Sequence, residues 1–495
     1  MEFFIEYLPL MMFAAMAVLL FTGYPVAFVM GGVGVGFATI GLLTGELIPI
    51  QLYTIATRIW AGAAENLVLT TIPLFVFMGV MLERSGVAKD MLHSLQTMLG
   101  RVPGGLTLAV TLLGIILAAA TGIVGASVVM MSMMALPLML EQNYSKTLAT
   151  GTIAASGTLG ILIPPSIMLV VIADLLSKSV GTMFMAAFVP GMMLGGLYLV
   201  YILVISTLRP KLAPRQKNTG SVSFLQLIVT LVIGLVPAFL LIFFVLGSII
   251  FGWATPTESA GVGAIGAIFL AFVVRPFIYA LLARTQFAIP DAVATKSQGN
   301  FVKRFAEENT GWWTSLRKTL SDSMQTVGMI FMTVVCAMVF SLTFRLLGGE
   351  HLITDFIRES GYGAWHILIV VMILGFLFEW IEVTLIVLPV VAPIILSLDF
   401  GDHAASADVA YWFAILLAVN LQTSFLTPPM GPALSYMKAV PSTGGLSLPY
   451  APRMRQRPFL ARPFPPRRGA SRNLFFALTA PRHNETMTTR QGSPA

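Results

Sequence analysis

The chain has 495 residues, of which 57% are hydrophobic and 10% are charged, and its mean hydropathy is +0.87. That composition excludes an ordinary soluble protein and predicts an all-α polytopic membrane protein. The net charge of +7 is concentrated at one end, because nine of the 29 basic residues but only one of the 22 acidic residues lie from Pro441 onward. Residues 1–440 therefore carry about −1, and we expect no nucleic-acid partner.

Seven apolar segments are predicted to be ordinary membrane spans. They are residues 3–20, 25–43, 67–82, 183–208, 224–246, 257–274 and 319–347. The first begins without a basic leader, so we expect it to remain as an anchor. Residues 51–66, which contain Arg58 and Trp60, are typical of a segment at the membrane interface. We expect residues 275–318 to be a cytoplasmic loop with some surface helix.

Two longer apolar stretches are interrupted near their midpoints. Residues 106–140 contain the small residues TGIVGAS at 121–127. Each half of roughly 14 residues reaches about 21 Å, which is short of a hydrocarbon core of about 30 Å. Residues 366–398 are interrupted in the same way at 379–384. Both stretches predict re-entrant hairpins, whose tips must be buried in protein or line a wet cavity.

Two further helices are expected to be broken. Residues 147–176 are cut by SGTLGILIPPS at 156–166, and residues 411–438 are cut by QTSFLTPPMGP at 422–432. Each Pro-Pro pair removes two amide donors, so an unwound midpoint is predicted in both helices. Paired interrupted segments in corresponding halves of a chain indicate the binding site of a transporter.

These pieces recur in the same order, which predicts a duplication. The Gly-rich segment 31–41 matches 260–270, the first hairpin matches the second, and IPPS at 163–166 matches TPPM at 427–430. Five predicted crossings separate the two units, and an odd number inverts the second. The distribution of basic residues places the entry of the first hairpin at the cytoplasmic face, so the second enters from outside and the tips meet.

The predicted domains follow from this inverted repeat. They are an N-terminal helix at 1–24, a first repeat at 25–208, a linker with a connecting helix at 209–255, a second repeat at 256–440 and a basic Pro/Arg-rich tail at 441–495.

The meeting point of the tips is suited to ions. A half-helix that starts inside the membrane presents N–H groups and partial positive charge, whereas one that ends there presents carbonyls. Hydroxyls add oxygen ligands of the kind that Na⁺ takes, at Ser127, Ser156, Thr158, Thr384, Thr423, Ser424 and Thr427. The alternative is that these small residues serve only to let the helices pack closely.

Two carboxylates, Glu379 and Glu382, lie at the second tip. An intramembrane carboxylate indicates a function, because burying it is costly. The alternative is that one of them faces water or caps the N-terminus of a half-helix. We expect Asp174 to be structural. The sequence contains no phosphate-binding loop of the form GxxxxGK[ST] and no metal or nucleophile cluster, so we expect neither ATP use nor an enzyme.

Residues 1–440 resemble the large membrane subunit of the tripartite ATP-independent periplasmic (TRAP) transporters. The most specific segments are GASVVMMSMMALPLML, GTLGILIPPSIMLVV and NLQTSFLTPPMGPALSYMK. The resemblance implies an elevator-type transporter in the bacterial inner membrane, with Na⁺ as coupling ion and no other cofactor. It also implies a small four-helix membrane subunit and a periplasmic solute-binding protein as partners. The implied substrate is an organic anion such as a C4-dicarboxylate or a 2-oxo acid.

The same resemblance assigns site residues. The first Na⁺ site would include Gly122, Gly125, Ser127, Ser156, Thr158 and Pro164, and the second Glu382, Thr384, Thr423, Ser424 and Pro428. Substrate contacts are assigned to Ser127, Ser166, Glu379, Thr427 and Gly431. The carboxylate pair has no counterpart at the first tip, so the two ion sites need not be equivalent.

Two alternative functions remain open. The nearer is a self-sufficient sodium/dicarboxylate symporter with the same hairpins and no binding protein. The more distant is a membrane enzyme or channel, which would need a catalytic cluster or a continuous polar pore. Neighbouring genes for a binding protein and a small membrane subunit would separate these hypotheses.

The tail from Pro441 lacks the last span that the repeat requires. Arginine and proline become abundant there, lysine is absent, and the longest apolar run is about six residues, against roughly 20 for a span. We hypothesise a frameshift after Val440, and expect a disordered tail and a loss of stability or activity. The alternative is a genuine basic tail whose arginines contact anionic lipid at the cytoplasmic face.

Overall fold

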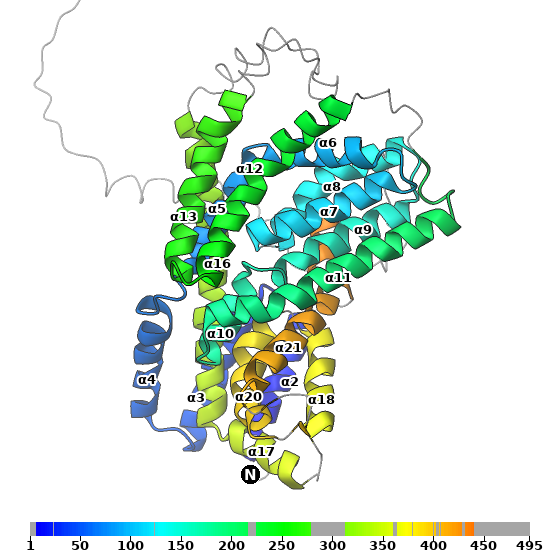
Figure 1. The fold of residues 1–495 in the computed structure, drawn as a ribbon. Helices are drawn as coiled ribbons and strands as arrows, with labels where there is room; N and C mark the ends of the chain where they lie inside the picture. Colours follow the sequence, from blue (N-terminus) through cyan, green and yellow to red (C-terminus); the bar gives the residue numbers. More distant parts are fainter. Residues whose placement is uncertain are drawn as a thin grey trace, which may run out of the picture. The chain divides into compact units, whose positions relative to one another are not determined.

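The computed structural model describes residues 6–22, 24–122, 124–215, 224–278, 312–359, 364–378, 380–398, 400–401, 405, 407–427 and 431–439. Every regular element within these ranges is a helix (Figure 1). Seven of the described helices are long and apolar enough to cross a membrane, and a bent pair would make an eighth. The prediction of an all-α, multi-pass membrane protein is therefore confirmed.

The first part of the chain forms α2 (Leu8–Phe21), α3 (Val26–Thr44), α4 (Pro49–Ile59), the π-helix η1 (Trp60–Ala64), α5 (Thr71–Arg84) and α6 (Val87–Leu99). Helix α6 lies in a stretch that its charges make look like a polar loop. Met91 and Leu95 on its other face are nevertheless buried. This helix was not predicted from the sequence, because its apolar face of period 3.6 is short and mixed with charge.

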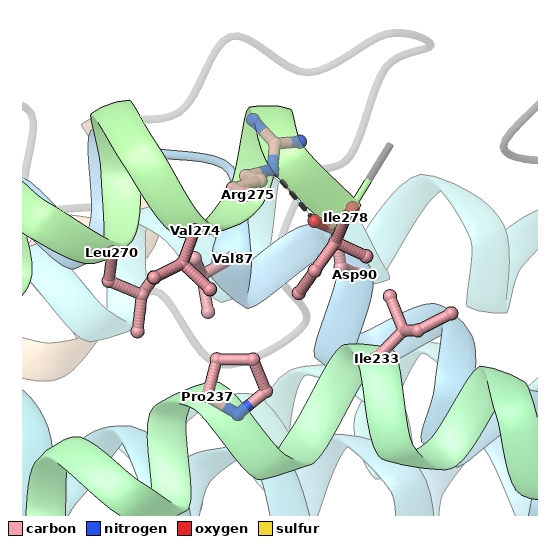
Figure 2. Close-up of a pocket in the computed structure, with 8 residues that line it drawn as sticks. All are labelled: Val87, Asp90, Ile233, Pro237, Leu270, Val274, Arg275 and Ile278. Carbon is pink, nitrogen blue, oxygen red and sulfur yellow. Dashed lines mark hydrogen bonds and ion pairs between the residues drawn. The ribbon is translucent and has the colours of Figure 1, made fainter. Parts of the chain in front are cut away.

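The chain bends by 60° between α5 and α6, and we call the bend at Ser85 and Gly86 the elbow. Gly86 has φ +80°, a left-handed conformation that glycine adopts without strain. Arg275, just after the π-helix η3 (Leu270–Val274), hydrogen-bonds the carbonyl of Ser85 and forms an ion pair with Asp90 (Figure 2). The elbow is thus fastened to a segment about 190 residues away in the sequence.

The first predicted hairpin consists of α7 (Gly105–Thr121) and α8 (Val124–Glu141), which pack side by side with α9 (Lys146–Thr158) (Figure 1). Gly122 ends α7 with φ +59°. The two halves have 17 and 18 residues, longer than predicted, and α8 by itself is long enough to cross a membrane. The halves are longer because α7 extends to Thr121 and α8 already begins at Val124, so both helices reach into the predicted interruption.

The first predicted broken helix is interrupted at the expected place. Helix α9 (Lys146–Thr158) tightens into the 3₁₀ turn η2 (Leu159–Ile161) and ends before Pro164-Pro165, and α10 (Ile167–Leu175) resumes after the turn. Ser166 caps α10 by accepting a hydrogen bond from the Leu169 amide. The prolines lack amide hydrogens and so cannot continue the helical ladder.

Four longer elements follow: α11 (Val180–Leu208), α12 (Phe224–Ile250), α13 (Pro256–Phe269), which continues into η3, and α16 (Trp312–Leu346). Part of the predicted cytoplasmic loop, residues 279–311, lies outside the described residues. A further amphipathic helix, α17 (Gly349–Glu359), was not predicted.

The second hairpin region consists of α18 (Ala364–Leu377), α19 (Trp380–Glu382), the π-helix η4 (Val383–Val387) and α20 (Leu388–Leu396). The predicted interruption at 379–384 is shorter in the structure, since the chain is helical again from Trp380. The second broken helix consists of α21 (Val409–Leu426) and α22 (Pro432–Ala439). Residues 441–495, the predicted tail, lie outside the described part.

The two Gly-rich helices pack reciprocally. Helix α3 lies along α16, and a Cβ placed on Gly34 would be 3.1 Å from the backbone of Phe340. Helix α13 lies along α5, where a Cβ on Gly263 would be 2.5 Å from the Met78 sulfur. Each Gly-rich helix of one half therefore packs against a helix of the other half, with small residues allowing the close approach.

Candidate functional site

The tip of the first hairpin lies against the break in the first broken helix. A Cβ placed on Gly122 would be 3.3 Å from the carbonyl oxygen of Pro165 and 3.4 Å from the amide nitrogen of Ile167. A Cβ on Gly160 would approach the backbone of Gly122 to 3.9 Å. The structure therefore brings Gly122 close to the turn that contains Pro164 and Pro165.

The arms of the hairpin enclose the end of α9. Ser156 is buried, and its Oγ donates to the Thr152 carbonyl oxygen at 2.6 Å. It also lies 3.4 Å from the hydroxyl of Thr111 on α7. Thr111 was missed in the sequence because it lies three turns before the tip, where it resembles any threonine in a packed helix. Buried Ser127 is the remaining predicted hydroxyl of this hairpin.

Most of the predicted hydroxyls donate to a nearby backbone carbonyl. The donations are from Thr158 to Ala155 at 2.8 Å, Ser166 to Ile161 at 2.6 Å, Thr423 to Asn420 at 2.6 Å, Ser424 to Leu421 at 2.8 Å and Thr427 to Thr423 at 2.8 Å. A hydroxyl that donates in this way keeps lone pairs that can accept or ligate. The geometry is compatible with both ion ligation and helix packing.

The second broken helix reaches the first hairpin. Helix α22 packs against α8 and α9, and a Cβ on Gly125 would be 3.0 Å from the ring of Tyr436. In return, α10 packs against α21 and η4. Gly431 lies directly before α22 and has φ +35°. Its amide donates a hydrogen bond to the Thr427 carbonyl oxygen at 3.0 Å. The predicted residues of the two halves therefore approach one another through these short helices.

The buried polar side chains of the second half include Glu382, Thr384 and Gln422. In the described part of the chain, the Thr384 hydroxyl and the Gln422 amide have no hydrogen-bond partner. Such buried groups call for an explanation, for which an ion or a water is the usual one. Gln422 was not assigned a role from the sequence, although it begins the QTSFLTPP motif. Glu379 and Pro428, two predicted site residues, lie outside the described residues.

A small cavity lies elsewhere, at the elbow (Figure 2). Val87 and Asp90 of α6, Ile233 and Pro237 of α12, and Leu270, Val274, Arg275 and Ile278 line it. None of the predicted site residues is among them. The described residues contain no group of three or more His, Cys, Asp or Glu side chains placed to hold a metal ion.

Seven described helices able to cross a membrane, together with paired interrupted helices that pack on one another, are typical of a multi-pass membrane protein of the transporter class. Comparison with known proteins identifies the family within this class. The chain belongs to the family described as the tripartite ATP-independent periplasmic transporter, DctM component, whose model matches residues 13–452.

Individual relatives agree with this assignment. The chain is 31% identical to the C4-dicarboxylate TRAP transporter large permease protein DctM of Vibrio cholerae, over 77% of this chain and 79% of that protein. It is 28% identical to the protein of the same name from Pseudomonas aeruginosa, over 79% and 82%. It is 27% identical to the isethionate TRAP transporter permease protein DctMQ of Oleidesulfovibrio alaskensis, over 86% of this chain and 60% of that protein.

Membership of this family fixes the broad role. The chain is a permease component of a membrane transporter and not an enzyme, and it is a multi-pass protein of the inner membrane. The family description is tripartite, so such a component works with a small membrane subunit and a binding protein.

Proposed function

We propose that this chain is the large permease subunit of a Na⁺-coupled importer for a small organic anion, with C4-dicarboxylates as the first candidates. The observation that carries the proposal is the packing of the Gly122 tip against the Pro165 turn, with α22 of the other half on the same hairpin. The two relatives named for C4-dicarboxylates support the substrate class.

The proposed ion sites are the two sets named from the sequence. Gly122, Gly125, Ser127, Ser156, Thr158 and Pro164 form the first, and Glu382, Thr384, Thr423, Ser424 and Pro428 form the second. Carbonyls at the end of α7 and the lone pairs of Ser156 and Thr423 supply oxygen ligands, which a hard cation prefers. Gln422 joins the second set, because its buried amide supports the presence of a polar occupant.

The proposed substrate site uses the starts of the short helices. Ser166 precedes α10 and Gly431 precedes α22, and both helix N-termini present amides and partial positive charge, which attract a carboxylate. Ser127, Thr427 and Glu379 complete the proposed set. In this arrangement the cation neutralises part of the charge of the anion that it accompanies.

The transport step that we propose is an elevator movement. The hairpins and broken helices form a block that moves against a frame containing α3, α5, α13 and α16. The reciprocal packing of α3 on α16 and of α13 on α5 supports a frame built from two inverted repeats. Entry of the two hairpins from opposite faces is part of this proposal.

The proposed partners are a small four-helix membrane subunit and a periplasmic solute-binding protein. The DctMQ relative, which is longer than this chain, supports the association with a small subunit. A self-sufficient sodium/dicarboxylate symporter remains the competing proposal.

One reconstitution separates these proposals. The chain and a small TRAP membrane subunit are placed in liposomes, and uptake of radiolabelled succinate is measured with and without the binding protein and an inward Na⁺ gradient. Uptake that needs all of these, and no ATP, supports the proposal. Full uptake without the binding protein favours the symporter, and full uptake driven by a proton gradient alone contradicts Na⁺ coupling.

A further inference from the structure

One hydrogen bond joins the turn before α5 to the end of α10. The side-chain amide of Asn66 donates from Nδ2 to Oδ2 of Asp174 at 2.7 Å, across 108 residues of sequence. The orientation of the Asn66 side-chain amide is determined by the backbone two residues further on, since the Val68 N–H donates to Oδ1 at 2.9 Å. Nδ2 must therefore face the Asp174 carboxylate.

The Asn66 side of this bond is anchored to the proposed frame. The Leu67 carbonyl oxygen, next to Asn66, accepts a hydrogen bond from the hydroxyl of Thr257 at 3.3 Å. That hydroxyl also lies 2.9 Å from the hydroxyl of Thr71, the first residue of α5. The turn is thus tied to the start of α13, which packs along α5.

The Asp174 side belongs to the proposed moving block. Asp174 lies in the last turn of α10, where the helix dipole disfavours a negative charge. The described residues contain no ion pair to Asp174. A carboxylate at the C-terminal end of a helix does not stabilise that helix. The hydrogen bond with Asn66 is therefore the interaction that explains Asp174 at this position.

We propose that the Asn66–Asp174 hydrogen bond is a latch that holds α10 docked on the turn before α5 in one end state of the transport cycle. This inference rests on the proposed elevator movement, because a latch requires that the block and the frame separate. A single charge-assisted bond is strong enough to bias two states, by roughly 10- to 100-fold, and weak enough to be broken in each cycle.

The test measures docking directly. Cys336→Ala removes the native thiol, and Leu67→Cys with Leu175→Cys places two thiols beside the latch, both at exposed side chains. The initial rate of cross-linking by a short bis-maleimide, in the complex with the small subunit, reports the docked population. The probe for transport is radiolabelled succinate.

Two latch variants and one control are compared in this background. Asn66→Asp places two carboxylates together and should slow cross-linking roughly tenfold or more. The exchanged pair Asn66→Asp with Asp174→Asn restores a donor opposite a carboxylate and should restore the rate. Asp322→Asn is the control, since it breaks the Arg84–Asp322 ion pair between α5 and α16 without touching α10. It should leave the rate unchanged.

The outcomes are separable. Equal cross-linking in Asn66→Asp and its parent, no recovery in the exchanged pair, or no cross-link in the parent would overturn the latch. Import of succinate by protein that is cross-linked between positions 67 and 175 would show that α10 and the turn before α5 do not separate during transport. That result would also overturn the latch. If no form of the complex imports succinate, the proposed substrate is wrong, and the cross-linking rates still decide the latch.

Discussion

Arg275 donates from Nε to a carboxylate oxygen of Asp90 at 2.8 Å, and this pair fastens the residue after η3 to the first turn of α6, next to the elbow. The two side chains are only 20% and 17% exposed. Removing one member of a largely buried ion pair leaves the other charge without its partner, which typically costs about 3–5 kcal/mol. The elbow should therefore depend on this pair for its stability.

We expect Arg275→Met to lower the thermal unfolding midpoint of the purified complex by several degrees. The matched control is Arg345→Met, whose ion pair with Glu350 is 39% and 37% exposed. Pairs of that kind contribute about 0–1 kcal/mol, so its midpoint should change little. Equal shifts in the two variants, measured by intrinsic fluorescence during heating, would contradict a special role for the elbow.

Gly122→Ala tests the tip of the first hairpin. Gly122 has φ +59°, and an added Cβ would also be 3.3 Å from the Pro165 oxygen, so we expect a cost of about 1–2 kcal/mol and reduced succinate uptake. Gly151→Ala on α9 is the control, because it lies within a helix and its Cβ would meet nothing within 4 Å. Uptake by Gly151→Ala should be unchanged. Normal uptake by the Gly122 variant would remove the tip from the proposed site.

Thr423→Ala tests the second ion site. If the hydroxyl contributes about 1.4 kcal/mol to binding, the Na⁺ concentration for half-maximal uptake should rise roughly tenfold. Thr423→Ser keeps the oxygen and should stay near the parent value. Thr150→Ala is the control, since this hydroxyl makes a similar bond to its own helix, to the Lys146 carbonyl, at an exposed position. A Na⁺ dependence that does not differ between Thr423→Ala and Thr150→Ala would favour helix packing as the role of Thr423.

The tail is tested at the level of DNA. The family match ends at residue 452, shortly after the change in composition at Pro441. We expect one of the two other reading frames beyond codon 440 to encode a continuous apolar segment of about 20 residues. A protein carrying that segment should have a higher thermal unfolding midpoint than the chain as written. If neither frame contains such a segment, the frameshift hypothesis is wrong and a basic tail remains.

Much of the secondary structure could be predicted because its causes are local. Pro164 and Pro165 lack amide hydrogens, so α9 had to end before them wherever the helix lies in the protein. Gly122 ends α7 for a similarly local reason, since few other residues adopt its backbone conformation. The apolar lengths of α3, α11 and α16 likewise indicated membrane spans without knowledge of their neighbours.

The features that the sequence left undetermined are those that depend on partners distant along the chain. The charges of Lys89 and Asp90 made α6 look like a polar loop in the sequence. The carboxylate of Asp90 is explained only by its ion pair with Arg275, which the fold brings next to it. The Ser156–Thr111 contact and the approach of α22 to α8 join segments that carry no local signal for each other. Which glycine face meets which helix, and which carboxylate meets Asn66, was decided by tertiary packing, because close approach and hydrogen bonding exist only once both surfaces are present.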